Sequence, residues 1–227
     1  MVADREIVAP PITSLHRDHT PLLRALRPAV AALARAHHFR DPFTCRHQER
    51  VAQLAASIGA LVGLPPLRIE ILRLAAMVHD IGKLGIPAET VGKAGKLSDP
   101  EYALVKTHCI IGHDILLQLN APFPIAEIVH QHHERLNGSG YPRGMSGTAI
   151  LEEARILAVA DTYDAMSSYR PYRAPLSEDF VLAELHKLAG HLLDRTAVDA
   201  CVRHVLSGAM AHPAAGSLAD EAPGQES

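Results

Sequence analysis

The sequence contains no tryptophan, and aromatic residues make up only 4% of its 227 positions. This scarcity argues against a surface for single-stranded nucleic acid, because such surfaces stack bases on aromatic side chains. The net charge of −3 provides no broad basic field that would attract a nucleic acid polymer or an anionic membrane. We therefore expect neither of these as a partner.

Cysteine is also scarce. The three cysteines lie far apart and form no CxxC pair, which is typical of a reducing compartment without structural disulfides. The sequence has no run of 18 apolar residues, and its first ten residues carry Asp4, Arg5 and Glu6 without an apolar segment. We predict no membrane span, no signal peptide and a cytoplasmic location.

Alternating strand patterns are nearly absent, whereas apolar residues recur at helical spacing along most of the chain. Ser98 or Asp99 can cap one such helix, with Pro100 in its first turn. The pattern predicts an all-α fold. The predicted helices cover about 22–36, 50–63, 67–80, 98–119, 124–136, 151–167, 177–193 and 194–206.

The helical region is long enough for one domain with an apolar core, because 48% of the residues are hydrophobic. We predict a single helical bundle over residues 14–208. The first 13 residues are expected to be flexible, and the acidic tail 209–227 is expected to be disordered, because it is small, polar and without Lys or Arg.

Histidine is abundant, with 15 residues, and histidine is the commonest metal ligand. The stretch "VHQHHERLNGSGYPRG" places the adjacent His132 and His133 before a glycine-rich turn and the pair Tyr141–Pro142. Adjacent imidazoles next to such a turn suit a metal site that faces a substrate-binding loop.

Further histidines and carboxylates stand at successive predicted helices, in the order H, HD, H, HH and D. Neutral imidazoles suit Fe, Mn or Zn, and a carboxylate can bridge two ions. Two ions about 3.5–4 Å apart can bind a phosphodiester from both sides and activate a bridging water. The candidate metal ligands are His47, His79, Asp80, His108, His132, His133 and Asp161.

Three segments resemble one family. "HDIGKLGIP" at 79–87, "HHERLNGSGYP" at 132–142 and "RILAVADTYDAMSSYRPYR" at 155–173 are similar to the HD-GYP branch of the HD superfamily of metal-dependent phosphohydrolases. The resemblance covers about residues 40–205. It implies a helical HD domain with a metal centre between its central helices. It also implies a phosphodiesterase that hydrolyses cyclic di-GMP to linear pGpG, and in some members on to GMP.

The resemblance further implies two divalent transition-metal ions, with iron and manganese as the best candidates. Asp80 would bridge the ions and act as a catalytic residue, and a hydroxide between the ions would attack the phosphorus. The remaining ligands would divide into His47, His79 and Asp161 on one ion and His108, His132 and His133 on the other.

Five more residues resemble functional positions of the family. Lys83 would stabilise charge that develops in the transition state. Gly140 and Tyr141 of the GYP turn would contact the substrate. Arg170 and Arg173 would hold its phosphates or guanine, since guanidinium groups suit both.

One position departs from the family. Some members hold a third metal ion with a glutamate one helical turn before the first histidine, and this chain has Phe43 there. We therefore expect two ions, which leaves the second cleavage, from pGpG to GMP, in doubt. Most relatives also carry a sensory domain, and we do not expect one within the roughly 45 residues before His47.

Three neighbours of the candidate ligands match no ligand position of the family. Glu134 is expected to form a hydrogen bond that supports the ligands. His130 is expected to support the ligands or to be buried, and His113 to be a partly exposed helix residue.

Other interpretations stay open. The substrate could be a hybrid cyclic GMP-AMP or a mononucleotide, although the GYP turn argues against the latter. A protein without catalysis could instead bind cyclic di-GMP or a GGDEF-type partner as a regulator. Taken singly, each histidine could be an ordinary residue at a helix end, Lys83 a solvated lysine favoured by the helix dipole, and Arg170 and Arg173 surface ion-pair residues.

Overall fold

The structure is a computed structural model that describes most of the chain. The expected flexible segment 1–13 and the expected disordered tail 209–227 lie outside the described residues, as do Arg170 and Arg173. The side chain of Phe43 also lies outside the described part. The described residues are 20–40, 42–93, 95–169 and 174–208.

These residues form helices joined by turns, with no β-strand among them, and the predicted all-α class is confirmed. None of the described helices combines the length and the apolar character needed to cross a membrane. The helices are α1 (Thr20–Arg40), α2 (Pro42–Leu61), α3 (Pro66–Met77), α4 (Ala88–Val91), α5 (Asp99–Lys106), α6 (His108–Leu117), α7 (Ile125–Gln131), α8 (Glu152–Ser167), α9 (Glu178–Leu188) and α10 (Arg195–Leu206), with the 3₁₀ helices η2 (Ile81–Gly85) and η3 (Gly147–Ala149).

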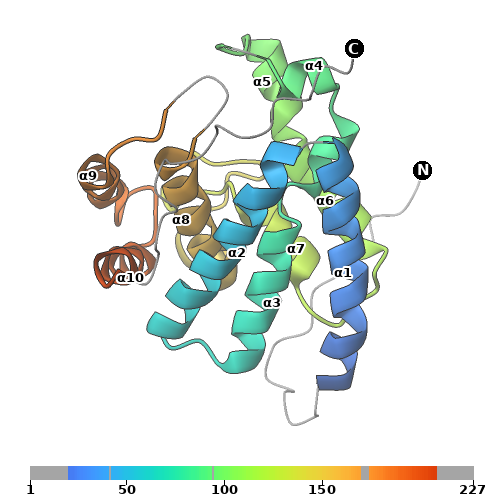
Figure 1. Cartoon of the computed structure of the whole chain (residues 1–227), viewed down its shortest axis with the longest axis horizontal. Helices are drawn as coiled ribbons and strands as arrows, with labels where there is room; N and C mark the ends of the chain where they lie inside the picture. The colour runs from blue at the N-terminus through green and yellow to red at the C-terminus, as the bar shows by residue number, and fades with distance from the viewer. Residues whose placement is uncertain (1–19, 41, 94, 170–173, 209–227) are drawn as a thin grey trace, which may run out of the picture.

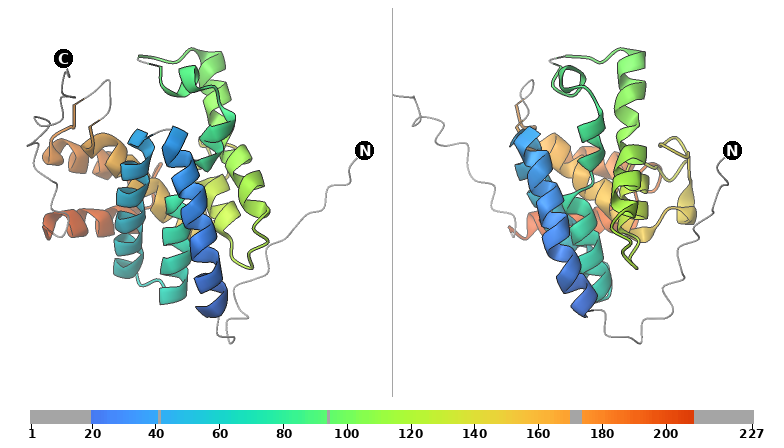
Figure 2. Two further views of the ribbon diagram at one scale, coloured as in Figure 1. Left: turned by 45° about the vertical axis from the view of Figure 1, so that its right-hand side comes forward. Right: turned by 90° about the vertical axis from the view of Figure 1, so that its right-hand side faces the viewer.

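Helix α2 lies in the middle of the bundle and packs against α1, α3, α8 and α10 (Figure 1). Its buried residues Val51, Leu54, Ala55 and Ile58 follow the spacing that gives a helix one apolar face. Helices α9 and α10 lie beyond α8 on the side away from α1. Helices α4 and α5 project beyond one end of the bundle (Figure 2).

The single helix predicted over 98–119 is wrong, because the chain forms two helices that meet at Thr107. In an unbroken helix the backbone N–H of His108 would bind the Leu104 carbonyl. The Thr107 hydroxyl instead donates to that oxygen over 2.7 Å. The His108 ring nitrogen Nδ1 takes the next carbonyl, that of Val105, also over 2.7 Å. The Leu104 carbonyl also accepts the backbone N–H of Thr107, over 3.1 Å, so both carbonyls have partners although the α-helical pattern stops.

Helix η2 lies against α6 because Gly82 has no side chain. A Cβ atom at this position would lie 1.9 Å from the carbonyl oxygen of His108 and 2.6 Å from the backbone nitrogen of Gly112. This close approach brings the segment with Asp80 and Lys83 next to the start of α6. The backbone therefore joins two groups of candidate ligands before any metal binds.

Candidate metal centre

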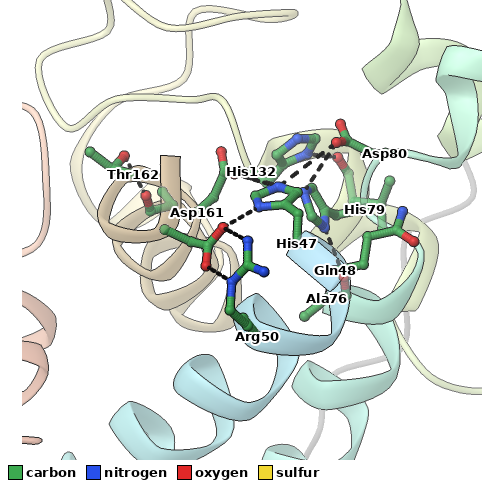
Figure 3. Close-up of polar contacts among 12 residues, drawn as sticks. His47, Gln48, Arg50, Ala76, His79, Asp80, His132, Asp161 and Thr162 are labelled. Atoms are coloured by element: carbon green, nitrogen blue, oxygen red, sulfur yellow. Dashed lines mark hydrogen bonds and ion pairs between the residues drawn. The ribbon is translucent and has the colours of Figure 1, made fainter. Parts of the chain in front are cut away.

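The first group of candidate ligands consists of His47 on α2, His79 just after α3 and Asp161 on α8. The ribbons of these three helices converge in Figure 3. The Nε2 atom of His47 lies 3.2 Å from Oδ1 of Asp161. The Nε2 atom of His79 lies 3.8 Å from the same oxygen. The two imidazoles and the carboxylate therefore face one point, as the predicted grouping requires.

The second group comes from α6 and the end of α7. One donor atom from each of His108, His132 and His133 lies within 4.8 Å of the others. The Nε2 atoms of His108 and His132 are 3.4 Å apart in the buried interior. Nδ1 of each ring contacts a backbone carbonyl, so both Nε2 atoms carry lone pairs and cannot donate to each other, and this arrangement suits a cation between them.

Asp80 stands between the groups. Its Oδ2 atom lies 3.5 Å from Nε2 of His79 and 4.0 Å from Nε2 of His47. Its Oδ1 atom lies 3.6 Å from Nε2 of His108, in the other group. The two oxygens of one carboxylate thus face different histidine groups. Lys83 lies at the rim, with Nζ 2.7 Å from Oδ2 of Asp80.

Helix ends orient three of the histidines. Nδ1 of His79 contacts the Ala76 carbonyl over 2.7 Å, and Nδ1 of His132 contacts the Val129 carbonyl over 2.6 Å. The contact of His108 with Val105 is of the same kind. A carbonyl oxygen only accepts hydrogen bonds, so Nδ1 must carry the proton. Each Nε2 therefore keeps a lone pair, which is the form that binds metal.

His47 is oriented by two residues that are not among the candidates predicted from the sequence. Its Nδ1 lies 2.7 Å from Oδ2 of Asp164, one helical turn after Asp161 on α8. Arg50 holds the same carboxylate through Nε at 2.5 Å and Nη2 at 2.9 Å. The sequence signal was present, since Asp164 follows Asp161 and Arg50 follows His47 by three residues each. Three residues is close to one helical turn, so the pairs share helix faces.

Burial sets the protonation of the second group. Burial lowers the pKa of His108 and, together with neighbouring imidazoles, holds the pKa of His132 well below its usual range. The pKa of His133 falls to about 3, mainly through burial. These three rings are therefore neutral near pH 7, as metal ligands must be.

The carboxylates remain ionised. Burial opposes the charge of Asp80, but Lys83 and the histidines outweigh it and keep the pKa well below the usual range. The pKa of Asp161 is also held well below its usual range, because the contact with His47 outweighs the effect of burial. Burial also opposes charging of His47, yet Asp161 and Asp164 raise its pKa to about 9 in the metal-free protein. A bound cation would take the place of that proton.

The residues fit a metal ion by this chemistry. Nε2 of His79 is buried and has no hydrogen-bond partner, although an unsatisfied buried nitrogen is costly. Neutral imidazoles and ionised carboxylates are the donor set that Fe, Mn or Zn would take.

Hydrogen bonds to Glu134 hold the glycine-rich turn next to the second histidine group. The Glu134 carboxylate accepts the backbone N–H groups of Arg143, over 2.7 Å, and Met145, over 2.9 Å. Glu134 is expected to support the ligands, but its two hydrogen bonds hold the backbone of the turn instead. A Cβ atom on Gly140 would lie 2.4 Å from the backbone nitrogen of Arg135, so the turn closes only with glycine there.

Tyr141 extends the centre outward. Its ring lies 4.8 Å from the His133 ring and 6.3 Å from the His108 ring, centroid to centroid. The peptide bond from Tyr141 to Pro142 is cis.

All seven predicted ligand residues thus lie in one centre, with Lys83 and Tyr141 at its edge and Gly140 in the adjoining turn. The predicted contacts Arg170 and Arg173 fall outside the described residues.

Comparison with known proteins gives a consistent picture. The family model described as "HD domain" matches residues 32–197. The cyclic di-GMP phosphodiesterase response regulator RpfG of Xanthomonas campestris is 41% identical over 179 residues, which cover 78% of this chain and 47% of that protein. The 3'3'-cGAMP-specific phosphodiesterase 3 of Vibrio cholerae is 39% identical over 166 residues, 73% of this chain and 36% of that protein.

Among solved structures, an HDG"Y"P protein from Bdellovibrio bacteriovorus matches with a TM-score of 0.60 at 21% identity. The match covers 72% of this chain and 52% of that one. At this sequence identity it shows only that the fold is similar. The chain spans less than half of the length of the two curated relatives above.

Proposed function

The chain belongs to the HD domain family, and from that premise we propose that it is a metal-dependent phosphodiesterase that hydrolyses cyclic di-GMP to linear pGpG. The observation that carries the proposal is the position of Asp80. Its two oxygens face two different groups of histidines, at 3.5 Å from His79 and 3.6 Å from His108. A carboxylate placed in this way suits a binuclear centre.

Two ions, iron or manganese, would be held by the two groups. His47, His79 and Asp161 would hold one, His108, His132 and His133 the other, and Asp80 would contact both. When bound, such ions supply Lewis acidity that polarises a phosphodiester and lowers the pKa of water.

The protein's own groups prepare the site. The carbonyls at the helix ends fix the ring orientations of His79, His108 and His132, so little reorganisation is needed when a ligand binds. Burial of the centre excludes water and strengthens each charge interaction. Lys83 is 25% exposed in its side chain, which leaves its ammonium able to reach a phosphate oxygen at the rim.

The substrate class is inferred from the relatives and from the turn. The relatives are named for cyclic di-GMP and for 3'3'-cGAMP, and both ligands are cyclic dinucleotides. The turn with Gly140 and Tyr141 lies beside the second histidine group, where a base or sugar could meet the Tyr141 ring. Because one relative of 39% identity is named for cGAMP, hydrolysis of cGAMP is the second candidate.

The direct test is turnover by protein purified anaerobically without chelator. Cyclic di-GMP and 3'3'-cGAMP are supplied separately, and the products are separated by chromatography. We expect pGpG to accumulate from cyclic di-GMP at a higher kcat/KM than for cGAMP, and His79→Ala to abolish turnover. Faster turnover of cGAMP would select the second candidate. Binding of either nucleotide without hydrolysis by metal-loaded protein would contradict the proposal and favour a regulator.

A further inference from the structure

Lys106, at the end of α5, differs from the other lysines near the centre. Lys83 pairs with Asp80 and Lys93 with Glu101, each over 2.7 Å. Within the described part of the chain, no carboxylate pairs with Lys106, although the residue is half-buried. A half-buried ammonium without a counterion is suited to receive an anion from solution.

The surroundings of Lys106 are aromatic. Its Nζ lies 5.2 Å from the centroid of the Tyr102 ring and 5.9 Å from that of the Tyr141 ring, within the range of cation–π contacts. Tyr102 is one helical turn earlier on α5 and is 49% exposed. The contact with Tyr102 alone would be an ordinary pair on one helix. Tyr141, however, belongs to the turn beside His133, so Lys106 connects α5 to the candidate metal centre.

A cyclic dinucleotide has two phosphates and two bases. The metal centre can take one phosphate, and the other phosphate with a neighbouring base must then lie outside it. We propose that Lys106 and Tyr102 form this outer subsite, with the ammonium on the phosphate that is not cleaved and the Tyr102 ring under a purine. The inference rests on the proposed function and names part of its substrate site. An exposed tyrosine face stacks on any base, and an ammonium is a suitable phosphate ligand.

Two substrates test the subsite. A cyclic dinucleotide would reach both the centre and the subsite, whereas bis(p-nitrophenyl) phosphate is a small diester that reaches the centre alone. For Lys106→Met we expect KM for the dinucleotide to rise about tenfold or more, as expected for a lost hydrogen bond to a charged group. The ratio of kcat/KM for the dinucleotide to that for the small diester should fall by a similar factor. Lys106→Arg should restore most of that ratio.

Matched variants show whether the ring or the hydroxyl of Tyr102 binds the substrate. They also show whether the charge of Lys106 acts locally or only through the net charge of the protein. Tyr102→Phe should keep the low KM, and Tyr102→Ala should raise it. Lys96→Met removes an exposed lysine just before α5 and should leave both substrates unaffected. An unchanged KM in Lys106→Met, or an equal loss with both substrates, would overturn the subsite.

Failure of the proposed function has a different signature. If the wild-type protein binds the dinucleotide without cleaving it, the same variants are compared by Kd, and the subsite is judged by the same tenfold criterion. If the wild-type protein neither binds nor cleaves the dinucleotide, both the function and the subsite are refuted.

A second, independent group is formed by one residue of α6 and two residues of α7 whose side chains meet between the two helices. One donor atom from each of His113, Glu127 and His130 lies within 4.8 Å of the others. His130 is only 7% exposed, and its Nδ1 is buried without a hydrogen-bond partner. The His113 and His130 rings stack 4.5 Å apart. These residues lie outside the seven candidate ligands described above.

Glu127 is already oriented. Its Oε1 accepts hydrogen bonds from Gln131 Nε2, over 2.6 Å, and from Arg143 Nη1, over 2.7 Å. Its Oε2 is directed to Nε2 of His113, at 3.5 Å. We infer that these three residues bind a divalent ion of the zinc class, because two histidines and a glutamate form a known zinc ligand set. Arg143 neutralises part of the carboxylate charge, so the ion should exchange readily.

The test counts ions. Full-length protein is equilibrated with buffered Zn²⁺, separated from free metal and analysed for zinc per chain. We expect Glu127→Gln and His113→Asn each to hold one zinc fewer than the wild-type protein, with circular dichroism unchanged. Glu89→Gln removes an exposed carboxylate elsewhere and should keep the wild-type count. Equal zinc counts in the wild-type protein and in both variants would overturn the site.

Discussion

We expect Asp164, which is not a candidate ligand, to set the metal affinity of the first histidine group by orienting His47. Its buried carboxylate accepts one bond from the Nδ1–H of His47 and two from Arg50. In Asp164→Asn the amide group can donate to Nδ1, which would move the ring proton to Nε2. That nitrogen faces Asp161 at 3.2 Å, so its lone pair would no longer be available to a metal.

The size of the effect follows from these contacts. Loss of a residue that supports a metal ligand typically costs about 10–100-fold in metal affinity. The charge-assisted bonds to Arg50 also weaken, and a bond to a charged group contributes about 1.5–3 kcal/mol. Because the Arg50 side chain is 32% exposed, water replaces part of the loss. We expect the metal-free variant to be less stable by about 2 kcal/mol.

Competition with a chromophoric chelator measures the Mn²⁺ affinity, and urea denaturation of the metal-free protein measures the stability. Asp199→Asn, at an exposed position on α10, is the matched control and should change neither quantity. If Asp164→Asn bound Mn²⁺ as tightly as the wild-type protein, Asp164 would not set the orientation of His47, and the reasoning would be refuted.

Three further outcomes follow from the same contacts. His79→Ala should lose bound metal and turnover while its circular dichroism stays helical, and retained turnover would contradict the role of His79. Gly140→Ala should lower the free energy of unfolding by about 1–3 kcal/mol, because its Cβ would overlap the backbone, and an unchanged urea midpoint would contradict this. Burial raises the pKa of Cys201 to about 12 and that of Cys109 further, so both thiols stay protonated at pH 8. Site-resolved mass spectrometry should find neither alkylated in the native protein, and rapid labelling of either would show that its surroundings open.

Much of the centre could be predicted from the sequence because its residues occur in order at successive helices. The motif around His79 and Asp80 and the pair His132–His133 are local in sequence. The all-α class was predictable for a similar reason, since helical spacing is also local.

The parts that were missed depend on contacts that local patterns do not contain. At the break at Thr107, two side chains donate to backbone carbonyls of the preceding turn, and such bonds compete with a continuous helix. Asp164 meets His47 across 117 positions of sequence, so its role needs the packing of α2 on α8. The position of Lys106 over Tyr141 likewise depends on how α5 lies beside the turn.

The proposed binuclear centre requires that one carboxylate, Asp80, joins two metal ions held by the two histidine groups. Anomalous diffraction from crystals of the Mn²⁺-loaded protein tests it most directly. We expect two anomalous peaks, one on either side of Asp80. One peak should lie within bonding distance of His47 and His79, and the other within bonding distance of His108 and His132. A single peak between the groups, or metal bound only elsewhere, would show that Asp80 does not join two ions.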